Sequence, residues 1–355
     1  MISIYKILLF TIRILPAEVA HNLSLIILKT GIINVRMPSK NYDKLSITVN
    51  NINFNNPIGL AAGYDKNGEA IKGLIKLSFG FVEIGSVTPK AQNGNKKPRL
   101  FRLYKDEAII NRMGFNNKGH VKLVKKLERF NKNSGILGVN LGVNLDSNDP
   151  ISDYLVGIER FSPLANYLVI NISSPNTLGL RGLQFGESLN NLLFSINKIR
   201  KKLKINGINS PVFVKIAPDI TDEELNFIIE GVRNYNIEGI VISNTTIERK
   251  FNLKSKVSSE VGGLSGKPLF SKSNELLRKA FQISKGEITL IGVGGVSSGK
   301  CAYEKICLGA SLVQLYSGLI FNGPGLIYKI NQEIITELEK DGFESIKEAI
   351  GSRVI

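Results

Sequence analysis

Residues 212–218 read VFVKIAP, an apolar run that only Lys215 interrupts. Short apolar runs of this kind are typical of parallel strands that are buried on both faces of a sheet. Seven further runs lie at residues 58–63, 81–88, 135–142, 167–174, 239–246, 290–296 and 312–318. Gly, Asn or Ser residues punctuate these runs and amphipathic segments separate them, so strands and helices should alternate along the chain.

Eight strand–helix units without a long linker predict an α/β fold, the closed (β/α)8 or TIM barrel, rather than two domains. The helices carry signals of their own, because Thr221 and Glu224 form a capping box ahead of an apolar stripe. An open, doubly wound sheet is the alternative. That fold normally has a GxGxxG turn after its first strand, whereas residues 63–66 read GYDK.

Two segments lie outside this repeat. Residues 89–115 are too long for a simple turn and contain RLFRL at 99–103 and IIN at 109–111. We therefore expect an inserted hairpin over the top of the barrel. At the amino end we expect a two-helix extension over residues 1–40, which leaves residues 41–355 to the barrel.

The extension contains two apolar segments. Residues 1–15 read MISIYKILLFTIRIL, with Lys6 and Arg13 as the charged side chains, and residues 17–28 place apolar side chains at helical spacing. A spanning helix needs about 20 apolar residues, so neither segment is long enough to cross a bilayer. Two short apolar helices with basic flanks favour a hairpin that lies on a membrane surface. A secretory signal and a helix pair packed on the barrel are the alternatives.

The composition indicates a folded and strongly basic protein. Hydrophobic residues make up 43% of the 355 residues, and 46 basic against 30 acidic side chains give a net charge of +16. This excess favours anionic lipid, nucleic acid or acidic ligands, although lysines spread along the chain also fit an ordinary solvated surface. Cys301 and Cys307 lie six apart in one predicted helix, which suggests neither a zinc site nor a disulfide. We expect no metal.

The side chains at the carboxyl ends of the predicted strands are amides, hydroxyls and lysines, with almost no carboxylates. In a barrel these ends carry the active site. The scarcity of carboxylates argues against metal-assisted hydrolysis and paired-carboxylate chemistry. Amides suit a flat ring with several C=O and N–H groups, lysines suit an anion, and the glycines at 294–295 suit a phosphate. Glycines and single asparagines also form plain turns, but Lys215 in a buried run needs a partner.

Motifs along nearly the whole chain resemble one family, the class 2 dihydroorotate dehydrogenases, which are membrane-associated and quinone-dependent. They are AAGYDKNGEA (61–70), FVEIGSVTPK (81–90), KPRLFRL (97–103), INRMGFNN (110–117), NISSPNTLGLR (171–181), VKIAPD (214–219), SNTT (243–246), GGLSGKPL (262–269), IGVGGVSSG (291–299) and GASLVQLYSG (309–318).

The resemblance implies that the chain oxidises dihydroorotate to orotate with FMN and passes the electrons to a membrane quinone, in pyrimidine biosynthesis. It makes Ser174 the base that takes the C5 proton, where the soluble classes carry Cys, and Thr177 is our candidate for relaying that proton. It places the substrate on Lys66, Asn111, Arg112, Met113, Gly114, Phe115, Asn171, Asn176, Asn244 and Thr245. It places FMN on Ala61, Ala62, Gly63, Lys66, Ser86, Asn140, Asn171, Lys215, Ser243, Gly266, Gly295, Tyr316 and Ser317. It places the quinone against His21, Arg102 and Tyr316.

The resemblance also implies a peripheral location on the cytoplasmic side of the cell inner membrane, or alternatively on the mitochondrial inner membrane. We further expect contact with an anionic membrane surface, a monomer, and no nucleic-acid partner. The chain departs from the family at Val143 and Leu145, where lysines are common, and has Ser86 and Ser243 where Thr is common.

Two rival functions remain. A tRNA dihydrouridine synthase resembles this fold and would suit the basic charge, but it uses a Cys acid near its substrate, and neither cysteine lies at a predicted strand end. A non-catalytic membrane-bound barrel would leave the polar strand ends without a purpose.

Overall fold

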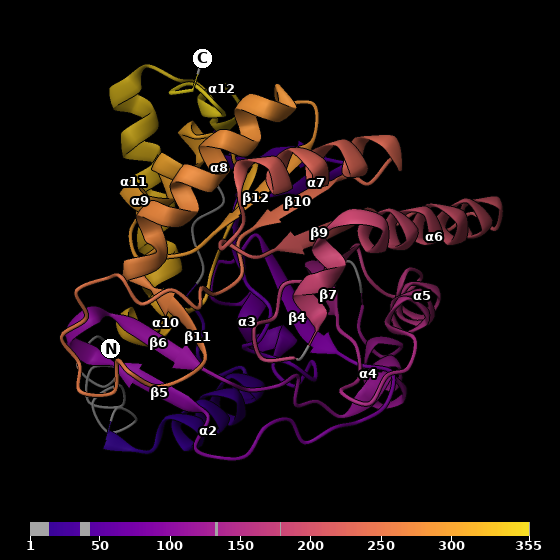
Figure 1. The fold of residues 1–355 in the computed structure, drawn as a ribbon. Coiled ribbons are helices and arrows are strands. Elements are labelled where there is room, and N and C mark those ends of the chain that lie inside the picture. Colours follow the sequence, from indigo (N-terminus) through magenta and orange to yellow (C-terminus); the bar gives the residue numbers. More distant parts are fainter. Residues whose placement is uncertain (1–13, 36–42, 132–133, 178, 355) are drawn as a thin grey trace.

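The computed structural model describes residues 14–35, 43–131, 134–177 and 179–354, and a closed barrel of parallel strands lies at its centre (Figure 1). The strands, in chain order, are β3 (Ile58–Leu60), β4 (Phe81–Val87), β7 (Ile136–Leu141), β8 (Tyr167–Asn171), β9 (Val212–Ile216), β10 (Gly239–Ile242), β12 (Thr289–Val293) and β13 (Leu312–Leu315). Neighbours in this order pair with each other and β13 closes on β3. The predicted (β/α)8 barrel is confirmed, and each predicted run overlaps one of its strands, although β12 begins at Thr289, one residue before its run.

Helices surround the strands and bury the outer face of the barrel (Figure 1). Almost every strand residue is buried, as expected for a sheet covered on both faces. The helices beyond α2 are α3 (Ile71–Ile75), α4 (Gly119–Leu127), α5 (Pro150–Phe161), α6 (Gly186–Ile205), α7 (Asp222–Asn234), α8 (Phe270–Ser284), α9 (Gly299–Cys307), α10 (Ser317–Asn322), α11 (Leu326–Asp341) and α12 (Ile346–Ala349). The capping box predicted at Thr221 and Glu224 begins α7, and both cysteines lie in α9.

A three-stranded antiparallel sheet is inserted into the barrel and has a small apolar cluster of its own. Its first two strands, β5 (Leu100–Leu103) and β6 (Ala108–Asn111), form a hairpin within the segment 89–115. The third strand, β11 (Gly263–Gly266), pairs with β6 from a distant part of the chain, and the sequence did not suggest it. A separate hairpin joins β1 (Ile47–Val49) to β2 (Ile52–Phe54). Short 3-10 helices occupy Asp43–Leu45, Tyr104–Asp106, Leu180–Gln184 and Lys267–Leu269.

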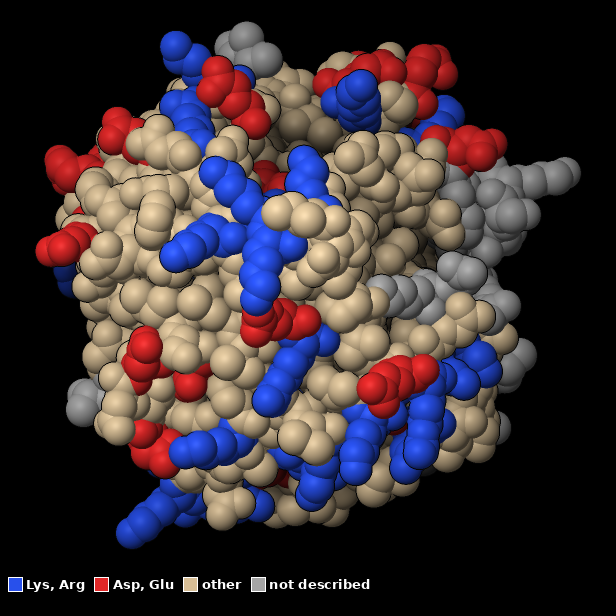
Figure 2. Space-filling view, turned by 90° about the vertical axis from the view of Figure 1, so that its right-hand side faces the viewer, with Lys and Arg blue, Asp and Glu red and all other residues tan. Residues whose placement is uncertain are grey.

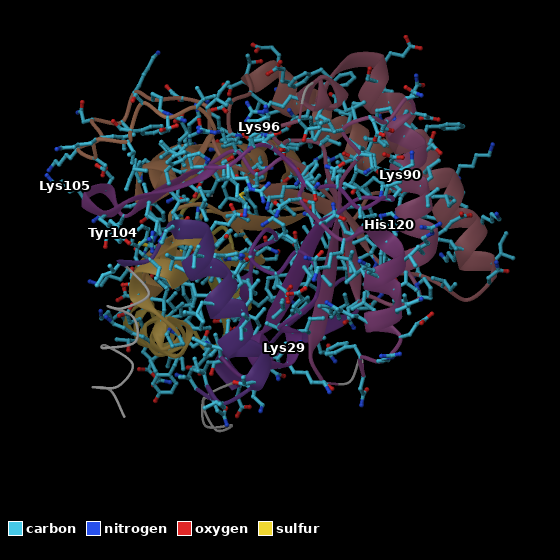
Figure 3. All side chains as sticks on the ribbon, turned by 90° about the horizontal axis from the view of Figure 1, so that it is seen from below. Lys29, Lys90, Lys96, Tyr104, Lys105 and His120 are labelled. Atoms are coloured by element: carbon cyan, nitrogen blue, oxygen red, sulfur yellow. The ribbon has the colours of Figure 1, made fainter. Side chains whose placement is uncertain are left out.

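The helix α2 (Ala17–Thr30) confirms the second apolar helix expected in the extension, whereas the first, at residues 1–15, lies almost wholly outside the described residues. The helix α2 packs against α3 and β5, and its Glu18 pairs with Arg99 at 2.7 Å. On its outer side Val19 and Ile26 remain 51% and 61% exposed. Figure 3 views the molecule from below, with Lys29 near the end of α2 and Tyr104 and Lys105 at the turn of the β5–β6 hairpin. No helix in the described part of the chain is long and apolar enough to cross a bilayer.

Basic and acidic side chains alternate over the face that carries α5 and α6, with the basic ones in excess (Figure 2). Some of them form surface ion pairs, such as Lys202 with Glu159 at 3.5 Å. The net positive charge is therefore distributed on this face and does not form one continuous basic patch.

Candidate active site

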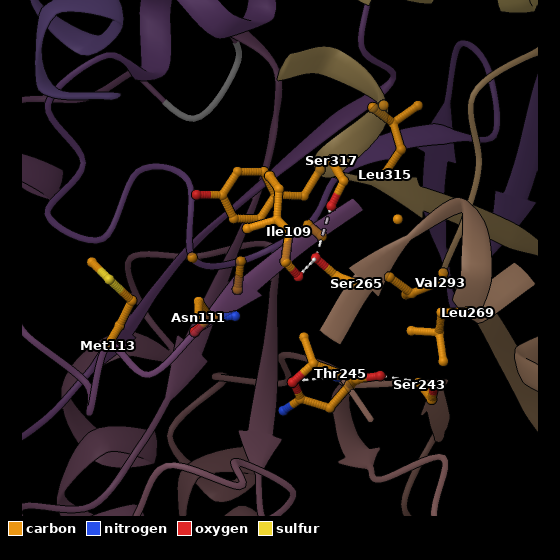
Figure 4. Close-up of a pocket in the computed structure, with 18 of the residues that line it drawn as sticks. Ile109, Asn111, Met113, Ser243, Thr245, Ser265, Leu269, Val293, Leu315 and Ser317 are labelled. Carbon is orange, nitrogen blue, oxygen red and sulfur yellow. Dashed lines mark hydrogen bonds between the residues drawn. The ribbon is translucent and has the colours of Figure 1, made fainter. Parts of the chain in front are cut away.

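A cavity with about 1350 Å³ of empty space, partly open to solvent, lies at the carboxyl ends of the barrel strands and is bordered by the inserted sheet. In Figure 4, Asn111 and Met113 approach it from β6 and the loop that follows. Ser243 and Thr245 approach from the end of β10. Parallel strands place their carboxyl ends at one edge of a barrel, which explains why residues so distant in sequence meet here.

Most of the predicted substrate and cofactor residues line this one cavity. They are Ala61, Ala62, Gly63, Lys66, Ser86, Asn111, Met113, Gly114, Phe115, Asn171, Ser174, Asn176, Lys215, Ser243, Asn244, Thr245, Gly266, Gly295, Tyr316 and Ser317. Two do not. The Arg112 guanidinium donates to Glu260 at 2.7 Å and lies 4.6 Å from the centre of the Phe101 ring. Asn140 is fully buried behind Ser86, which donates to its side-chain oxygen.

Lys215 is a buried cation that points into the cavity. Its residue is only 5% exposed, and no acceptor for its ammonium occurs among the described residues. Burial lowers the pKa of Lys215, while the carboxylate of Glu83 opposes that shift. An unpaired buried ammonium needs an acceptor from elsewhere, so the cavity fits a ligand that offers an oxygen or a nitrogen lone pair at this point.

A second lysine, Lys66, lines the same cavity. Its ammonium donates to the carbonyl of Gly63 at 2.7 Å. Burial, together with the positive charge of Arg99, lowers its pKa to about 8. Two lysines without a carboxylate partner make the cavity suitable for an anionic ligand.

The amide side chains of the site are held in two hydrogen-bonded groups. Asn171 donates to Ser86 at 3.0 Å, and Asn244 donates to the Asn171 oxygen at 3.2 Å and to Ser173 at 2.9 Å. On the other side, Asn176 donates to the backbone carbonyl of Asn111 at 3.2 Å. Side chains held in this way present fixed donors and acceptors, as the recognition of a polar ring requires.

Ser174 lies in the cavity wall and is 6% exposed. Its hydroxyl oxygen accepts from the backbone N–H of Asn176 at 3.3 Å. No histidine or carboxylate is hydrogen-bonded to it in the described part of the chain, and no hydrogen bond between the hydroxyls of Ser174 and Thr177 is present there. The relay through Thr177 therefore stays a prediction.

The loop after β12 forms a cradle of backbone amides. Gly294 and Gly295 have φ angles of +125° and +72°, and a Cβ on Gly295 would lie 2.5 Å from Phe270. The N–H groups of Gly295, Val296 and Ser297 have no backbone acceptor among the described residues. Amides free in this way bind phosphate oxygens. Together with the unpaired ammonium of Lys215, this cradle fits FMN, whose phosphate and ring would occupy the two ends of the cavity.

Hydroxyl groups border this cradle. Ser265 of β11 and Ser317 at the start of α10 are hydrogen-bonded at 2.9 Å (Figure 4). The sequence indicated Ser317 but missed Ser265, because GLSG looks like a glycine-rich loop rather than a strand.

A second, more apolar cavity of about 980 Å³ lies between α2 and the β5–β6 hairpin. Arg102 and His21 line it, and His21 also borders the first cavity. Burial lowers the pKa of His21 to about 3, so its imidazole is neutral. The ring of Tyr64 contacts residues of both cavities, since its centre lies 5.1 Å from that of His21 and 5.5 Å from that of Tyr316. Sequence reasoning missed Tyr64 and Ser24, whose hydroxyls are 2.8 Å apart.

Comparison with known proteins shows the family of the chain. A sequence profile of the family described as "Dihydroorotate dehydrogenase" matches residues 44–338. The chain belongs to the dihydroorotate dehydrogenase family. A relative from Bartonella tribocorum, named "Dihydroorotate dehydrogenase (quinone)", is 49% identical over 336 residues, which cover 94% of this chain and 92% of the relative. A protein of the same name from Brucella melitensis is 48% identical over 333 residues, or 94% and 91% of the two chains.

Solved dihydroorotate dehydrogenase structures share the fold. The DHODH of Eimeria tenella in complex with ferulenol superposes with a TM-score of 0.91 at 36% identity, over 95% of each chain. Its ligand-free form gives 0.90 at 37% identity, over 95% of this chain and 99% of the other.

Proposed function

We propose that the chain is a quinone-dependent dihydroorotate dehydrogenase that oxidises (S)-dihydroorotate to orotate with FMN, in the synthesis of pyrimidines. One observation carries the proposal. A cavity lined by Ser174, Lys215 and five asparagines adjoins an apolar cavity under α2, and His21 borders both. A site for a polar ring and a site for an apolar electron acceptor thus lie next to each other.

FMN, when bound, accepts a hydride from the substrate and then passes electrons to the quinone. The amides of Gly295 to Ser297 would hold its phosphate, and Lys215 would lie against its ring. A cation here stabilises negative charge on the reduced ring, which is the main electronic influence a protein has on a flavin. Ser86 and Ser243 would supply hydroxyl contacts in the wall beside it.

Ser174 acts as the base in the oxidation. Its hydroxyl oxygen takes the proton from C5 of dihydroorotate, while the hydride leaves C6 and the C5–C6 double bond of orotate forms. A hydroxyl is a weak base, so its own proton must leave at the same time. Thr177, which is buried three residues further on, is our candidate for the first acceptor of that proton.

The substrate carboxylate needs a cation, and Lys66 lines the cavity without a carboxylate partner. The asparagines offer donors and acceptors to the C=O and N–H groups of the ring. Arg112 is directed to Glu260, so any contribution to substrate binding comes from its backbone rather than its guanidinium.

The quinone enters through the second cavity, where its ring meets His21 and Arg102. Tyr316, the third residue predicted for the quinone site, lines the first cavity instead, and its ring centre lies 5.5 Å from that of Tyr64. The exposed apolar side of α2, with Val19 and Ile26, supports peripheral contact with a membrane. We place the protein on the cytoplasmic side of the inner membrane, as a monomer. No nucleic acid is required.

The test uses the full chain purified in detergent. We expect a flavin absorption spectrum that bleaches when dihydroorotate is added without oxygen and returns when a quinone is added. A protein that binds no flavin, or whose flavin dihydroorotate does not bleach, would contradict the proposal. Bleaching without recovery by quinone would contradict only the choice of acceptor.

A further inference from the structure

A carboxylate is enclosed within the barrel below the cavity. Glu83 of β4 is fully buried, and its two oxygens accept three hydrogen bonds, from Asn140 at 2.8 Å, Tyr167 at 3.2 Å and Gln314 at 2.6 Å. All three donors are neutral and buried. The nearest balancing charge is Lys215, whose ammonium form Glu83 favours. Burying an ion in this way is costly, which raises the question of what the carboxylate does.

An ionised carboxylate can only accept hydrogen bonds, and this property fixes the orientation of its neighbour. Asn140 must turn its NH2 group toward Glu83, so its oxygen faces Ser86. The Ser86 hydroxyl then donates its single proton to Asn140 and leaves a lone pair for Asn171. The direction of each bond is therefore set by the one before it, starting from the charge.

We propose that Glu83 is a positioning residue that sets the direction of the hydrogen-bond chain through Asn140 and Ser86, and thereby the atoms that Asn171 and Asn244 present to the substrate ring. This inference deepens the proposed function and rests on it in one respect, the use of orotate as the probe.

The donors and acceptors that Asn171 and Asn244 leave free at the end of this hydrogen-bond series can be counted. Asn171 gives one N–H to Ser86, and its oxygen accepts from Ser173 and Asn244, so it has one N–H left for a ligand. Asn244 uses both N–H groups on Asn171 and Ser173, and its oxygen accepts from the N–H of Thr245 at 2.8 Å. Asn244 thus offers an acceptor. An adjacent donor and acceptor match the alternating C=O and N–H groups of a pyrimidine ring.

The hydrogen bonds at the Asn171 end of this series have the same direction. The backbone N–H of Ser173 donates to the Asn171 oxygen at 3.2 Å, and a backbone N–H can only donate. Asn171 therefore has an anchor at each end, and the loss of one should weaken its orientation without abolishing it. We expect a moderate effect on ligand affinity, not a complete loss.

The experiment compares three variants with the full-length, FMN-loaded protein. Glu83→Gln removes the charge at constant shape, so Asn140 is free to turn over. In the exchange variant E83Q/N140D the carboxylate moves from position 83 to position 140, the next member of the hydrogen-bond series. It accepts from Ser86 on one side and from the new Gln amide on the other, which restores the original direction. Tyr167→Phe is the matched control, because it removes one donor to Glu83 and keeps the charge.

Orotate affinity, read from the shift of the flavin spectrum, and the unfolding temperature are measured for each variant. Glu83→Gln should bind orotate about tenfold more weakly, as expected for about one hydrogen bond lost or misdirected. The exchange variant should recover to within about threefold of the wild-type affinity. Tyr167→Phe should unfold at a lower temperature and bind orotate normally.

Two outcomes would overturn the inference. One is a Glu83→Gln protein that is less stable but binds orotate as tightly as the wild type, since Glu83 would then only support packing. The other is an exchange variant that retains FMN but binds orotate as weakly as Glu83→Gln does. If Glu83→Gln does not fold, an exchange variant that retains FMN and binds orotate more weakly than about threefold below the wild type would overturn the inference as well. A wild-type protein that binds FMN but no orotate would instead contradict the proposed function.

Discussion

At the scale of single residues, Ser174 is where the proposed chemistry can be tested most directly. We expect Ser174→Ala to bind FMN and orotate almost normally, because, among the described residues, its hydroxyl accepts a single backbone hydrogen bond. Reduction of the flavin by dihydroorotate should slow by roughly 10²–10⁴-fold, the usual contribution of a positioned base. Anaerobic stopped flow measures this step alone. Ser174→Cys is the control and should retain part of the rate, with a lower pH optimum because a thiol ionises more readily. Fast reduction in Ser174→Ala would refute the assignment.

His120 makes the stability of the protein depend on pH. It is fully buried in α4, with its ring centre 5.0 Å from that of Phe161. Burial, with the charge of Arg160 nearby, lowers its pKa to about 4 in the folded state. The unfolded chain therefore takes up the proton first, and stability is lost as the pH falls from about 6.5 to about 4, by about 3 kcal/mol in all.

His120→Leu should remove this part of the pH dependence. Since His21 is also buried and neutral, with a pKa of about 3, we expect about half of the dependence that the two histidines cause to remain. Urea unfolding at several pH values measures the slope. A slope between pH 6.5 and 4 that is unchanged in His120→Leu would mean that other groups, and not this imidazole, cause the loss.

Some residues of the site could be predicted from the sequence and others could not. Side chains at strand ends were identifiable, because a barrel gathers those ends in one place. Glu83 and Tyr64 were missed for different reasons. Glu83 lies in the middle of β4 and not at its carboxyl end, so the rule that strand ends carry the active site does not include it. Tyr64 acts through contact with α2, and no local pattern predicts a contact between segments so far apart.

At the scale of elements, the existence of each barrel strand was predictable, whereas the residue at which each strand begins or ends was not. The predicted run at residues 58–63 continues beyond β3, which ends at Leu60. Its last residues, Ala61 to Gly63, turn into the cavity wall instead. The strand β11 was not predictable, because two of its four residues are glycines and its partner β6 lies about 150 positions earlier in the chain. Apolar patterning reports burial, whereas pairing between distant segments is decided only by the complete fold.

The helix α2 is attached to the barrel by one well-formed ion pair, and this attachment can be weakened. Arg99 donates two hydrogen bonds to Glu18, at 2.7 and 3.2 Å, and its side chain is 7% exposed. Glu18→Gln would leave the Arg99 charge without its counter-ion. We expect a loss of about 2 kcal/mol in the free energy of unfolding, together with a higher KM for quinone and unchanged flavin reduction by dihydroorotate.

Lys97→Gln is the matched control for this ion pair. Lys97 also contacts Glu18, at 3.4 Å, but its side chain is 66% exposed. Exposed pairs contribute about 0–1 kcal/mol, so this variant should behave like the wild type in both assays. Equal effects of the two substitutions would show that the Arg99 pair has no special role in holding α2.

At the scale of the whole molecule, the barrel and the extension should be separable in function. Every barrel strand lies beyond Pro57, and the first cavity is formed almost entirely by the barrel and the inserted sheet. The second cavity depends on α2, which supplies Ala17, Ala20, Ser24, Ile27 and Leu28. The two half-reactions should therefore respond differently when the amino end is removed.

Deletion of residues 1–30 should leave a protein that retains FMN and is reduced by dihydroorotate at nearly the normal rate. The deletion uncovers Tyr64 and Leu77, so detergent will be needed to prevent aggregation. Reoxidation by a long-tailed quinone should slow strongly, because one wall of the quinone cavity is gone, and binding to anionic vesicles should fall with it. A small water-soluble electron acceptor provides the control, since it needs no such cavity and should reoxidise both proteins alike. If the shortened protein passes electrons to the long-tailed quinone as fast as the full chain, α2 serves only for packing.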